Sequence, residues 1–229
     1  GFYYKTFMWP KNFWYKIYEP IIRKAAGLGV APLKPDPDRY EHKFEYCDVL
    51  VAGSGPSGLA SALAAAKNGA RVILAEDKPR FGGSLLVDEV TIGNTKGKDW
   101  ADETIQYLKS MPNVIVKNRS QVFGYYDHNM MVMLERTKDH IENPTKFIPR
   151  QRLWYIRAKE VIISTGSIER PLVFGNNDRP GIMLASAAKE YMKVYGVLVG
   201  KKPIIFTNND SGYETAIEFK KNGAEPIVV

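Results

Sequence analysis

The stretch CDVLVAGSGPSGLASALAAAKNGARVILAED, residues 47–77, decides the fold of this chain. Its apolar start, CDVLVAG, has the composition of a buried parallel strand. The alanine-rich segment at 56–70 predicts a helix that ends near Gly69. A second apolar run, RVILAE at 71–76, predicts the next strand. Strand, turn, helix and strand together make a unit of about 30 residues that joins two parallel strands through a helix.

The turn between the first strand and the helix, GSGPSG, contains Gly53, Gly55 and Gly58 in the spacing GxGxxG. The spacing alone is weak evidence, but a strand precedes it and a helix follows it. In this context Gly53 permits the tight turn, Gly55 lets the backbone approach a pyrophosphate, and Gly58 lets the helix pack against the strand. The helix N-terminus offers N–H groups to the phosphates. We therefore expect a dinucleotide site rather than an empty turn.

An acidic residue, Glu76, stands at the end of the second strand, 18 residues after Gly58. A carboxylate in this place accepts hydrogen bonds from the ribose hydroxyls of the adenosine half of a dinucleotide. Its negative charge would repel a 2′-phosphate. Glu76 therefore favours NAD or FAD over NADP.

Two further turns are candidates for contact with the same ligand. Gly82 and Gly83 in RFGGSLL allow close backbone contact with the ribose and diphosphate, and Ser84 offers a side-chain contact. Thr165 and Gly166 follow a predicted buried strand, where open α/β sheets bind ligands at the carboxyl ends of their strands. A plain turn is the alternative at both places.

The rest of this region predicts a helix with Asp99 as its N-cap and a strand at 113–118. Segments 121–127, 130–136 and 153–158 predict three antiparallel strands, and 160–166 predicts a further buried strand. Strands that alternate with helices, interrupted by such a meander, indicate an α/β fold with a small β insertion. The fold class is therefore a Rossmann-like FAD/NAD(P)-binding domain.

Residues 203–229 repeat the strand, turn, helix, strand order, with Gly212 in the place of Gly58. Thr207 and Asn209 stand where the first turn has its other two glycines. Their side chains would hinder the close approach of a pyrophosphate. We expect the start of a second, degenerate dinucleotide-binding unit.

The domain organisation follows from these patterns. We expect an aromatic-rich N-terminal segment and linker at 1–46, a dinucleotide-binding domain at 47–170, and a linker, helix and truncated second unit at 171–229. Nine of the first eighteen residues are aromatic, and apolar residues four apart predict a helix there with a break at Pro20. Asp210 and Ser211 are expected to cap the last helix.

Composition excludes several classes of function. A net charge of +7 permits nucleic-acid binding, but no recognition motif accompanies it, and no apolar run is long enough for a membrane helix. The three histidines lack the spacing of metal ligands, and no nucleophile has a positioned base. The single cysteine, Cys47, excludes internal disulfides and indicates a reducing, cytoplasmic location. We predict no catalytic residue, metal, membrane or nucleic-acid partner.

Several specific segments together resemble the alpha subunits of heterotetrameric sarcosine oxidases. The resemblance covers essentially the whole chain and is carried by GFYYKTFMWP, the 47–77 unit, GGSLL, GYYDHN, STGSIERPLVFGNNDRPGIMLASAAKEYM and FTNNDSGYETA. It implies a domain of the glutathione-reductase type in a complex that demethylates sarcosine oxidatively to glycine. The other products are hydrogen peroxide and formaldehyde, or methylenetetrahydrofolate when folate is present.

The resemblance also implies cofactors and partners. It places NAD in this subunit, FAD in a beta subunit where sarcosine is oxidised, and FMN at the interface of the two, with gamma and delta subunits completing the complex. It implies NAD contacts at Gly53, Gly55, Pro56, Ser57, Gly58, Glu76, Gly83, Ser84 and Thr165. Val122 is expected to meet the adenine through its backbone.

Three alternatives stay open at this point. One alternative is an FAD-binding subunit of a related amine, opine or proline dehydrogenase, because Glu76 and the glycines serve either dinucleotide. A non-catalytic scaffold with a structural nucleotide is compatible with the missing catalytic residues. The aromatic opening is expected either to cover a contact with a partner subunit or to pack on its own domain.

Overall fold

A computed structural model describes residues 9–10, 12–29 and 31–229. The chain divides into two compact units, Gly1–Asp38 and Arg39–Val229. Within the first unit, a π-helical turn η1 (Trp14–Tyr18) leads into helix α2 (Glu19–Ala25). Pro20 lies in the first turn of α2, and the helical turns change there from π-helical to α-helical without interruption.

The aromatic opening lies mostly beyond the described residues. Phe2, Tyr3, Tyr4 and Phe7 are outside them, so the predicted interface role of the opening stays a prediction. Trp9 is described and is exposed.

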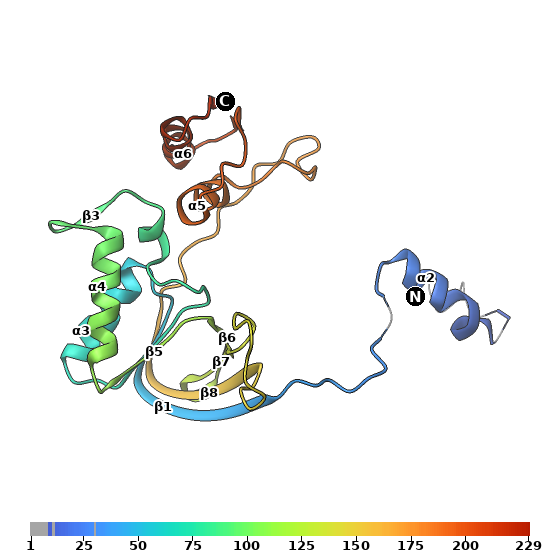
Figure 1. The fold of residues 1–229 in the computed structure, drawn as a ribbon, viewed down its shortest axis with the longest axis horizontal. Helices are drawn as coiled ribbons and strands as arrows, with labels where there is room; N and C mark the ends of the chain where they lie inside the picture. Colours follow the sequence, from blue (N-terminus) through green and yellow to red (C-terminus); the bar gives the residue numbers. More distant parts are fainter. Residues whose placement is uncertain (1–8, 11, 30) are drawn as a thin grey trace. The chain divides into compact units, whose positions relative to one another are not determined.

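A six-stranded sheet forms the centre of the second unit, in the order β5-β2-β1-β8-β7-β6. Neighbours among β5, β2, β1 and β8 are parallel, whereas β7 and β6 are antiparallel to their neighbours. The two longest strands curve together, and β6 and β7 lie inside the curve (Figure 1). The strands are β1 (Tyr40–Ala52), β2 (Val72–Ala75), β5 (Val114–Lys117), β6 (Ser120–Tyr126), β7 (Met130–Arg136) and β8 (Gln151–Ile163).

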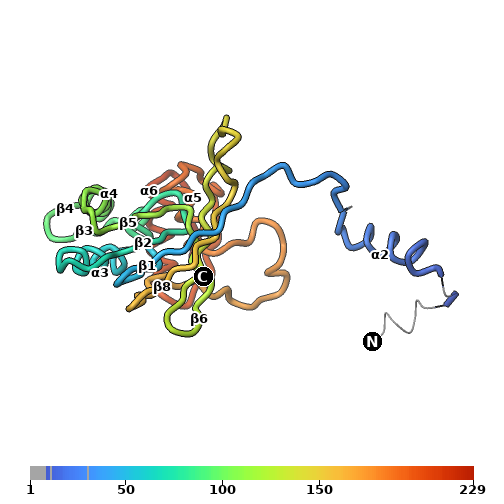
Figure 2. The backbone as a smooth tube through the Cα atoms, turned by 90° about the horizontal axis from the view of Figure 1, so that it is seen from below, coloured from blue at the N-terminus to red at the C-terminus, as the bar shows by residue number. Residues whose placement is uncertain are grey.

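Two helices, α3 (Pro56–Lys67) and α4 (Gly97–Ser110), pack together beside β2 and β5 (Figure 2). They bury one apolar core against the sheet, which includes Val51, Leu59, Leu74 and Leu108. A second core, which includes Ile73, Met133 and Ile156, fills the inside of the curved sheet. This is the α/β fold with a meander that the sequence predicts.

Three details of the prediction are wrong. The strands predicted at 153–158 and 160–166 form one continuous strand, β8, because it pairs with β1 along its whole length. For the same reason β1 begins at Tyr40 instead of at Cys47. Helix α4 has Lys96 at its N-cap, and Asp99 lies in the first helical turn, where its charge favours the helix dipole.

The second βαβ unit is present near the end of the chain. Strands β9 (Ile204–Ile205) and β10 (Ile227–Val228) are parallel, with helix α6 (Asp210–Lys221) between them. Helix α5 (Ala185–Tyr195) precedes the unit and packs on α6. The side chain that caps α6 belongs to Asn209, not to Asp210 or Ser211 as predicted. The predicted domain boundary between residues 170 and 171 stays a prediction.

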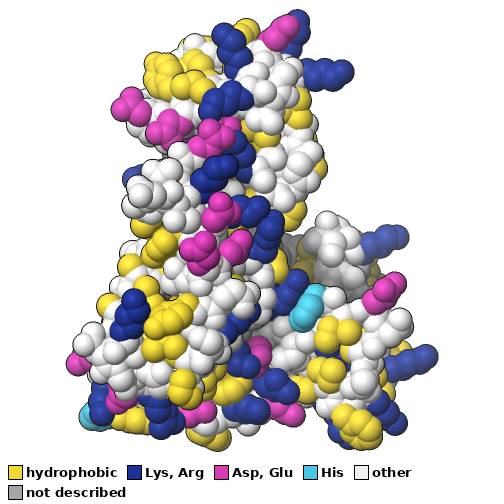
Figure 3. All heavy atoms as spheres, turned by 60° about the vertical axis from the view of Figure 1, so that its left-hand side comes forward, with side chains coloured by type: hydrophobic (Ala, Val, Ile, Leu, Met, Phe, Trp, Pro, Cys, Tyr) yellow, Lys and Arg dark blue, Asp and Glu magenta, His cyan; other side chains and the backbone are white. Residues whose placement is uncertain are grey.

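Shorter elements connect the larger ones: 3₁₀ turns η2 (Gly83–Leu86) and η3 (Asp127–Asn129), and strands β3 (Thr91–Ile92) and β4 (Thr95–Lys96). On the face seen in Figure 3, Lys and Arg side chains are interspersed with Asp and Glu side chains rather than gathered into a patch of one sign. Across the described residues, none of the helices combines the length and apolar character needed to cross a bilayer.

Candidate functional site

Three turns meet at the carboxyl ends of parallel strands β1, β2 and β8. The N–H of Gly53, after β1, donates to the carbonyl oxygen of Ala75 at the end of β2 (2.8 Å). The N–H of Ser164, after β8, donates to the carbonyl oxygen of Ala52 (2.8 Å). The sheet therefore brings together the glycine turn, the Glu76 region and the Thr165 region, which the sequence predicted separately.

The three glycines of the first turn face different surroundings. Gly53 has a positive φ of 99°, and a side chain there would collide with the carbonyl oxygen of Ser164. A side chain at Gly58 would collide with the carbonyl oxygen of Gly53. At Gly55, by contrast, an added Cβ would meet no atom within 4 Å. Gly53 and Gly58 are thus required by the fold, and Gly55 leaves open space above the backbone.

The N-terminus of α3 faces the same open space. Gly55 is the N-cap residue and no side chain caps the helix. Pro56 has no N–H, and Ser57 is exposed. The first N–H groups and the positive end of the helix dipole are therefore available to an anion, such as a diphosphate.

The Gly82–Gly83 turn lies directly against the first turn. Gly82 and Gly83 both have positive φ, 120° and 54°. An added Cβ at Gly83 would be 2.8 Å from the Cα of Gly55, so only glycine allows this approach. Gly83 and Ser84 are exposed, whereas Gly82 is buried. The second predicted turn thus forms one wall beside the open space.

Ser54 connects the three segments, and sequence reasoning missed it. It has no exposed surface, and its N–H and Oγ both donate to Oε2 of Glu76, at 2.9 and 2.5 Å. The N–H of Gly82 donates to the carbonyl oxygen of Ser54 (3.1 Å) and to its Oγ (3.3 Å). A serine between two glycines of the motif gives no signal in the sequence, because its partners lie far along the chain.

Glu76 is nearly buried, with 6% of its surface exposed. Its Oε1 accepts a hydrogen bond from the N–H of Lys78 (3.0 Å). Burial raises the pKa of the Glu76 carboxyl, and the adjacent Asp77 carboxyl raises it further, whereas the hydrogen bonds from Ser54 and Lys78 lower it. The acid is thus held by backbone and side-chain donors at the place predicted for ribose recognition.

The remaining predicted residues lie around these turns. Thr165 and Gly166 are exposed in the loop after β8, and Gly166 has a positive φ of 71°. The N–H of Ser120 donates to the carbonyl oxygen of Glu76 (2.8 Å), so β6 begins beside the acid. Val122 follows on this edge strand next to an irregularity in the β6–β7 register. A free strand edge leaves backbone groups available to an adenine.

A separate groove is lined by Tyr46, Cys47, Arg71, Pro112 and Asn113, together with neighbouring apolar residues. It lies where β2 and β5 begin, which is the opposite end of the strands from the three turns. Cys47 is buried, and burial raises the pKa of its thiol to about 12, which favours the protonated form. In the described part of the chain, no cluster of His, Cys, Asp and Glu could hold a metal.

The chain is similar to known proteins in both sequence and structure. The family model described as FAD dependent oxidoreductase matches residues 48–129. Over 229 residues, the whole chain, the sequence is 50% identical to the sarcosine oxidase subunit alpha of Rhizobium meliloti (strain 1021), and it covers 23% of that protein. The predicted resemblance is confirmed. The sarcosine oxidase subunit alpha of Corynebacterium sp. (strain P-1) is 40% identical over 207 residues, which are 89% of this chain and 21% of that protein.

The chain therefore spans less than a quarter of the length of these sarcosine oxidase alpha subunits. Among solved structures, the L-proline dehydrogenase from P. horikoshii is similar with a TM-score of 0.65 and 22% identity, over 82% of this chain and 36% of that one. This similarity confirms the fold class, a Rossmann-like FAD/NAD(P)-binding domain.

Proposed function

We propose that the three turns bind a dinucleotide through its ADP half, and that the dinucleotide is NAD. The observation that carries the proposal is the open space above Gly55, which lies between the uncapped start of α3 and the Gly83 turn. A diphosphate placed there would lie against bare backbone and N–H groups. Glu76 would accept a ribose hydroxyl, and the backbone near Val122 would lie beside the adenine.

FAD is a second candidate for the same site. It carries the same ADP half, and the match to the FAD dependent oxidoreductase family over residues 48–129 favours it. Either dinucleotide would supply hydride transfer when bound. The residues of this chain would bind and orient it. Because Glu76 would repel a 2′-phosphate, NADP fits neither version of the proposal.

The same proposal extends to the complex. The similarity to sarcosine oxidase alpha subunits supports a role in an enzyme that oxidatively demethylates sarcosine to glycine, with formaldehyde or methylenetetrahydrofolate and hydrogen peroxide. FAD would lie in a beta subunit and FMN at the interface with it, with gamma and delta subunits as further partners. The single cysteine supports a cytoplasmic location.

The decisive experiment denatures the purified complex and identifies the nucleotide released from each subunit. NAD released from this polypeptide is the expected result, FAD would establish the second candidate, and no nucleotide would contradict both. Reduction of the bound nucleotide during turnover of the complex would exclude a non-catalytic scaffold.

A variant tests the assigned contact. We expect Glu76→Ala to weaken nucleotide binding by about 1 to 3 kcal/mol, because a hydrogen bond to a charged group is lost. Calorimetric titration with NAD measures the change. An unaltered affinity would remove Glu76 from the site.

A further inference from the structure

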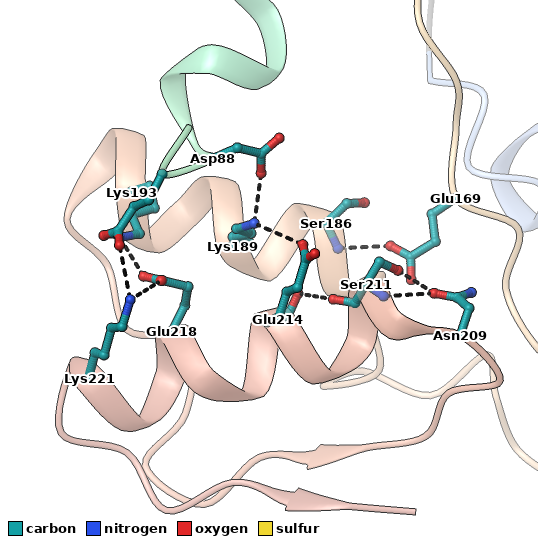
Figure 4. Close-up of polar contacts among 12 residues, drawn as sticks. Asp88, Glu169, Ser186, Lys189, Lys193, Asn209, Ser211, Glu214, Glu218 and Lys221 are labelled. Carbon is teal, nitrogen blue, oxygen red and sulfur yellow. Dashed lines mark hydrogen bonds and ion pairs between the residues drawn. The ribbon is translucent and has the colours of Figure 1, made fainter. Parts of the chain in front are cut away.

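Helix α5 contacts the chain on both sides of the Gly82–Gly83 turn. Before the turn, Nζ of Lys78 donates to Oε1 of Glu190 in α5 (2.6 Å). After the turn and η2, Oδ1 of Asp88 accepts a hydrogen bond from Nζ of Lys189 in α5 (2.7 Å), as Figure 4 shows. One helix thus holds both ends of the turn that forms a wall of the candidate site.

The same helix contacts the loop that follows β8. The N–H of Ser186, in the first turn of α5, donates to Oε2 of Glu169 (2.8 Å). Glu169 comes four residues after Thr165, which lies at the candidate site. Further along α5, Lys193 pairs with Glu89 in the loop after η2 (2.8 Å). Helix α5 is therefore connected to the segments that follow β2, η2 and β8.

The lysines of α5 are more shielded from water than their partners. The side chain of Lys189 is 12% exposed, and that of Asp88 is 36% exposed. Lys193 is 21% exposed, against 60% for Glu89. Charges that are partly removed from water are screened less by salt than exposed charges. Because Met192 and its neighbours pack α5 on α6, these lysines extend from a helix that is itself held in place.

We propose that α5 is a positioning helix for the dinucleotide site: it holds the Gly82–Gly83 turn in its binding position, so that nucleotide binding and the docking of α5 on these loops strengthen each other. The inference rests on the proposed dinucleotide function. An added Cβ at Gly83 would be 2.8 Å from the Cα of Gly55, so a displaced turn would change the open space above Gly55. The ion pairs of α5 would thus act on the nucleotide through the position of the turn.

The native complex provides the first test. After removal of any bound nucleotide, hydrogen exchange is measured with and without ADP, the half shared by NAD and FAD. We expect ADP to slow exchange at least about twofold in α5 as well as in residues 82–86, because coupling between two sites is reciprocal. Protection of residues 82–86 without any change in α5 would overturn the inference. Failure to bind ADP would instead contradict the proposed function, and the inference with it.

A double variant of α5 provides the second test. Lys189→Met together with Glu190→Gln removes the contacts with Asp88 and Lys78. The net charge stays the same, so the long-range attraction of ADP is preserved. Calorimetry of the variant complex should show an ADP affinity reduced about threefold to fivefold, and ADP should protect α5 less than in the native protein. An unaltered affinity would overturn the inference.

Lys202→Met together with Glu225→Gln is the matched control. Lys202 and Glu225 form an ion pair of 3.2 Å in which both side chains are 76% exposed, and the same two substitutions again preserve the net charge. The control should keep the native ADP affinity, and an equal loss in it would overturn the inference. Lys189→Arg keeps the charge and should keep most of the affinity. If circular dichroism shows that the α5 double variant is unfolded, the exchange measurement on the native complex decides by itself.

Discussion

The two βαβ units of this chain share a fold but differ in the turn that precedes the helix. In the first unit, Gly55 faces open space and no side chain caps α3. In the second, the side chain of Thr207 packs on Gly212, and Oδ1 of Asn209 accepts the N–H of Ser211 (3.1 Å). The side chain of Asn209 thus binds a helix N–H of the kind that no side chain caps in the first turn.

The comparison separates two roles of the glycines in the GxGxxG motif, which are close packing of the helix and open space beside the backbone. Gly58 and Gly212 occupy equivalent places, and at each an added Cβ would strike the start of its own turn. Helix packing therefore needs this glycine in both units. Open space lies above Gly55, and the second unit has Asn209 at the equivalent position. A βαβ unit can lose the binding turn and still keep the fold.

The largest expected effect separates binding from stability at Gly55. Gly55→Val should reduce nucleotide affinity at least about 100-fold, because the side chain fills the diphosphate space. The free energy of unfolding should change by less than about 1 kcal/mol, since φ at Gly55 is −67° and the residue precedes Pro56 in an extended conformation. Calorimetric titration and urea unfolding measure the two quantities.

Gly175→Val is the matched control for this variant. Gly175 is exposed, has open space around an added Cβ and lies outside the three turns. Nucleotide affinity should be unchanged in it. Retention of nucleotide by Gly55→Val would contradict the proposed site.

The next effect concerns stability at the two equivalent glycines. Gly58→Ala should cost about 3 kcal/mol, because the new Cβ meets the backbone carbonyl of Gly53. Gly212→Ala should cost about 2 kcal/mol, because its Cβ would lie 2.5 Å from the Cβ of Thr207. Only the second cost comes from a side chain, so Thr207→Gly should remove most of it.

A double-mutant cycle of urea unfolding free energies checks this difference. The cost of Gly212→Ala is measured with Thr207 present and with Thr207→Gly. Equal costs in the two backgrounds would show that the two residues are not coupled, contrary to the packing described.

Local patterns in the sequence predict much of this structure. The apolar runs and the glycine spacing lie within a few residues of each other, so β2, β5, α3 and the first turn were predicted correctly. Arg157, Lys159 and Glu160 interrupt the apolar pattern, so the sequence predicted two strands where the structure has one, β8. The strand is continuous because it pairs with β1. Its partner residues on β1 lie more than a hundred residues earlier in the chain. No local pattern contains that information.

The candidate site shows the same limit. Glu76 and the glycine turns follow from known spacing, whereas Ser54 acts through partners at Glu76 and Gly82. The cap of α6 was assigned wrongly because Asn209, Asp210 and Ser211 are all good capping residues in a row. Only the backbone conformation, extended at Asn209 and helical from Asp210, selects among them.

A smaller effect is expected at the two N-cap positions. Asn209→Ala should destabilise the protein by about 1 kcal/mol, because the Asn209 side chain accepts from the N–H and the Oγ of Ser211. Gly55→Ala, at the equivalent place, should cost less, about 0.5 kcal/mol, since no side-chain hydrogen bond is lost and only the preference for glycine over alanine at an N-cap remains. Urea unfolding of both variants tests the comparison, and equal costs would contradict it.

The smallest effect concerns the ion pairs that connect α5 and the second βαβ unit to the loop after η2. Lys189 of α5, 12% exposed, pairs with Asp88 after η2 (2.7 Å) and lies 3.9 Å from Glu214 of α6 (Figure 4). Lys193 and Lys221 pair in the same way with Glu89 (2.8 and 2.9 Å). Ion pairs thus connect the loop after the Gly83 turn to α5 and to α6.

We expect a coupling energy of about 0.5 to 1 kcal/mol between Asp88 and Lys189 in a double-mutant cycle of Asp88→Asn and Lys189→Met. The pair is only partly exposed, so salt should weaken the coupling without abolishing it. Lys202 and Glu225, both 76% exposed and 3.2 Å apart, form the control pair and should show no measurable coupling. Equal coupling in the two pairs would contradict the expectation that partial burial strengthens the Asp88–Lys189 pair.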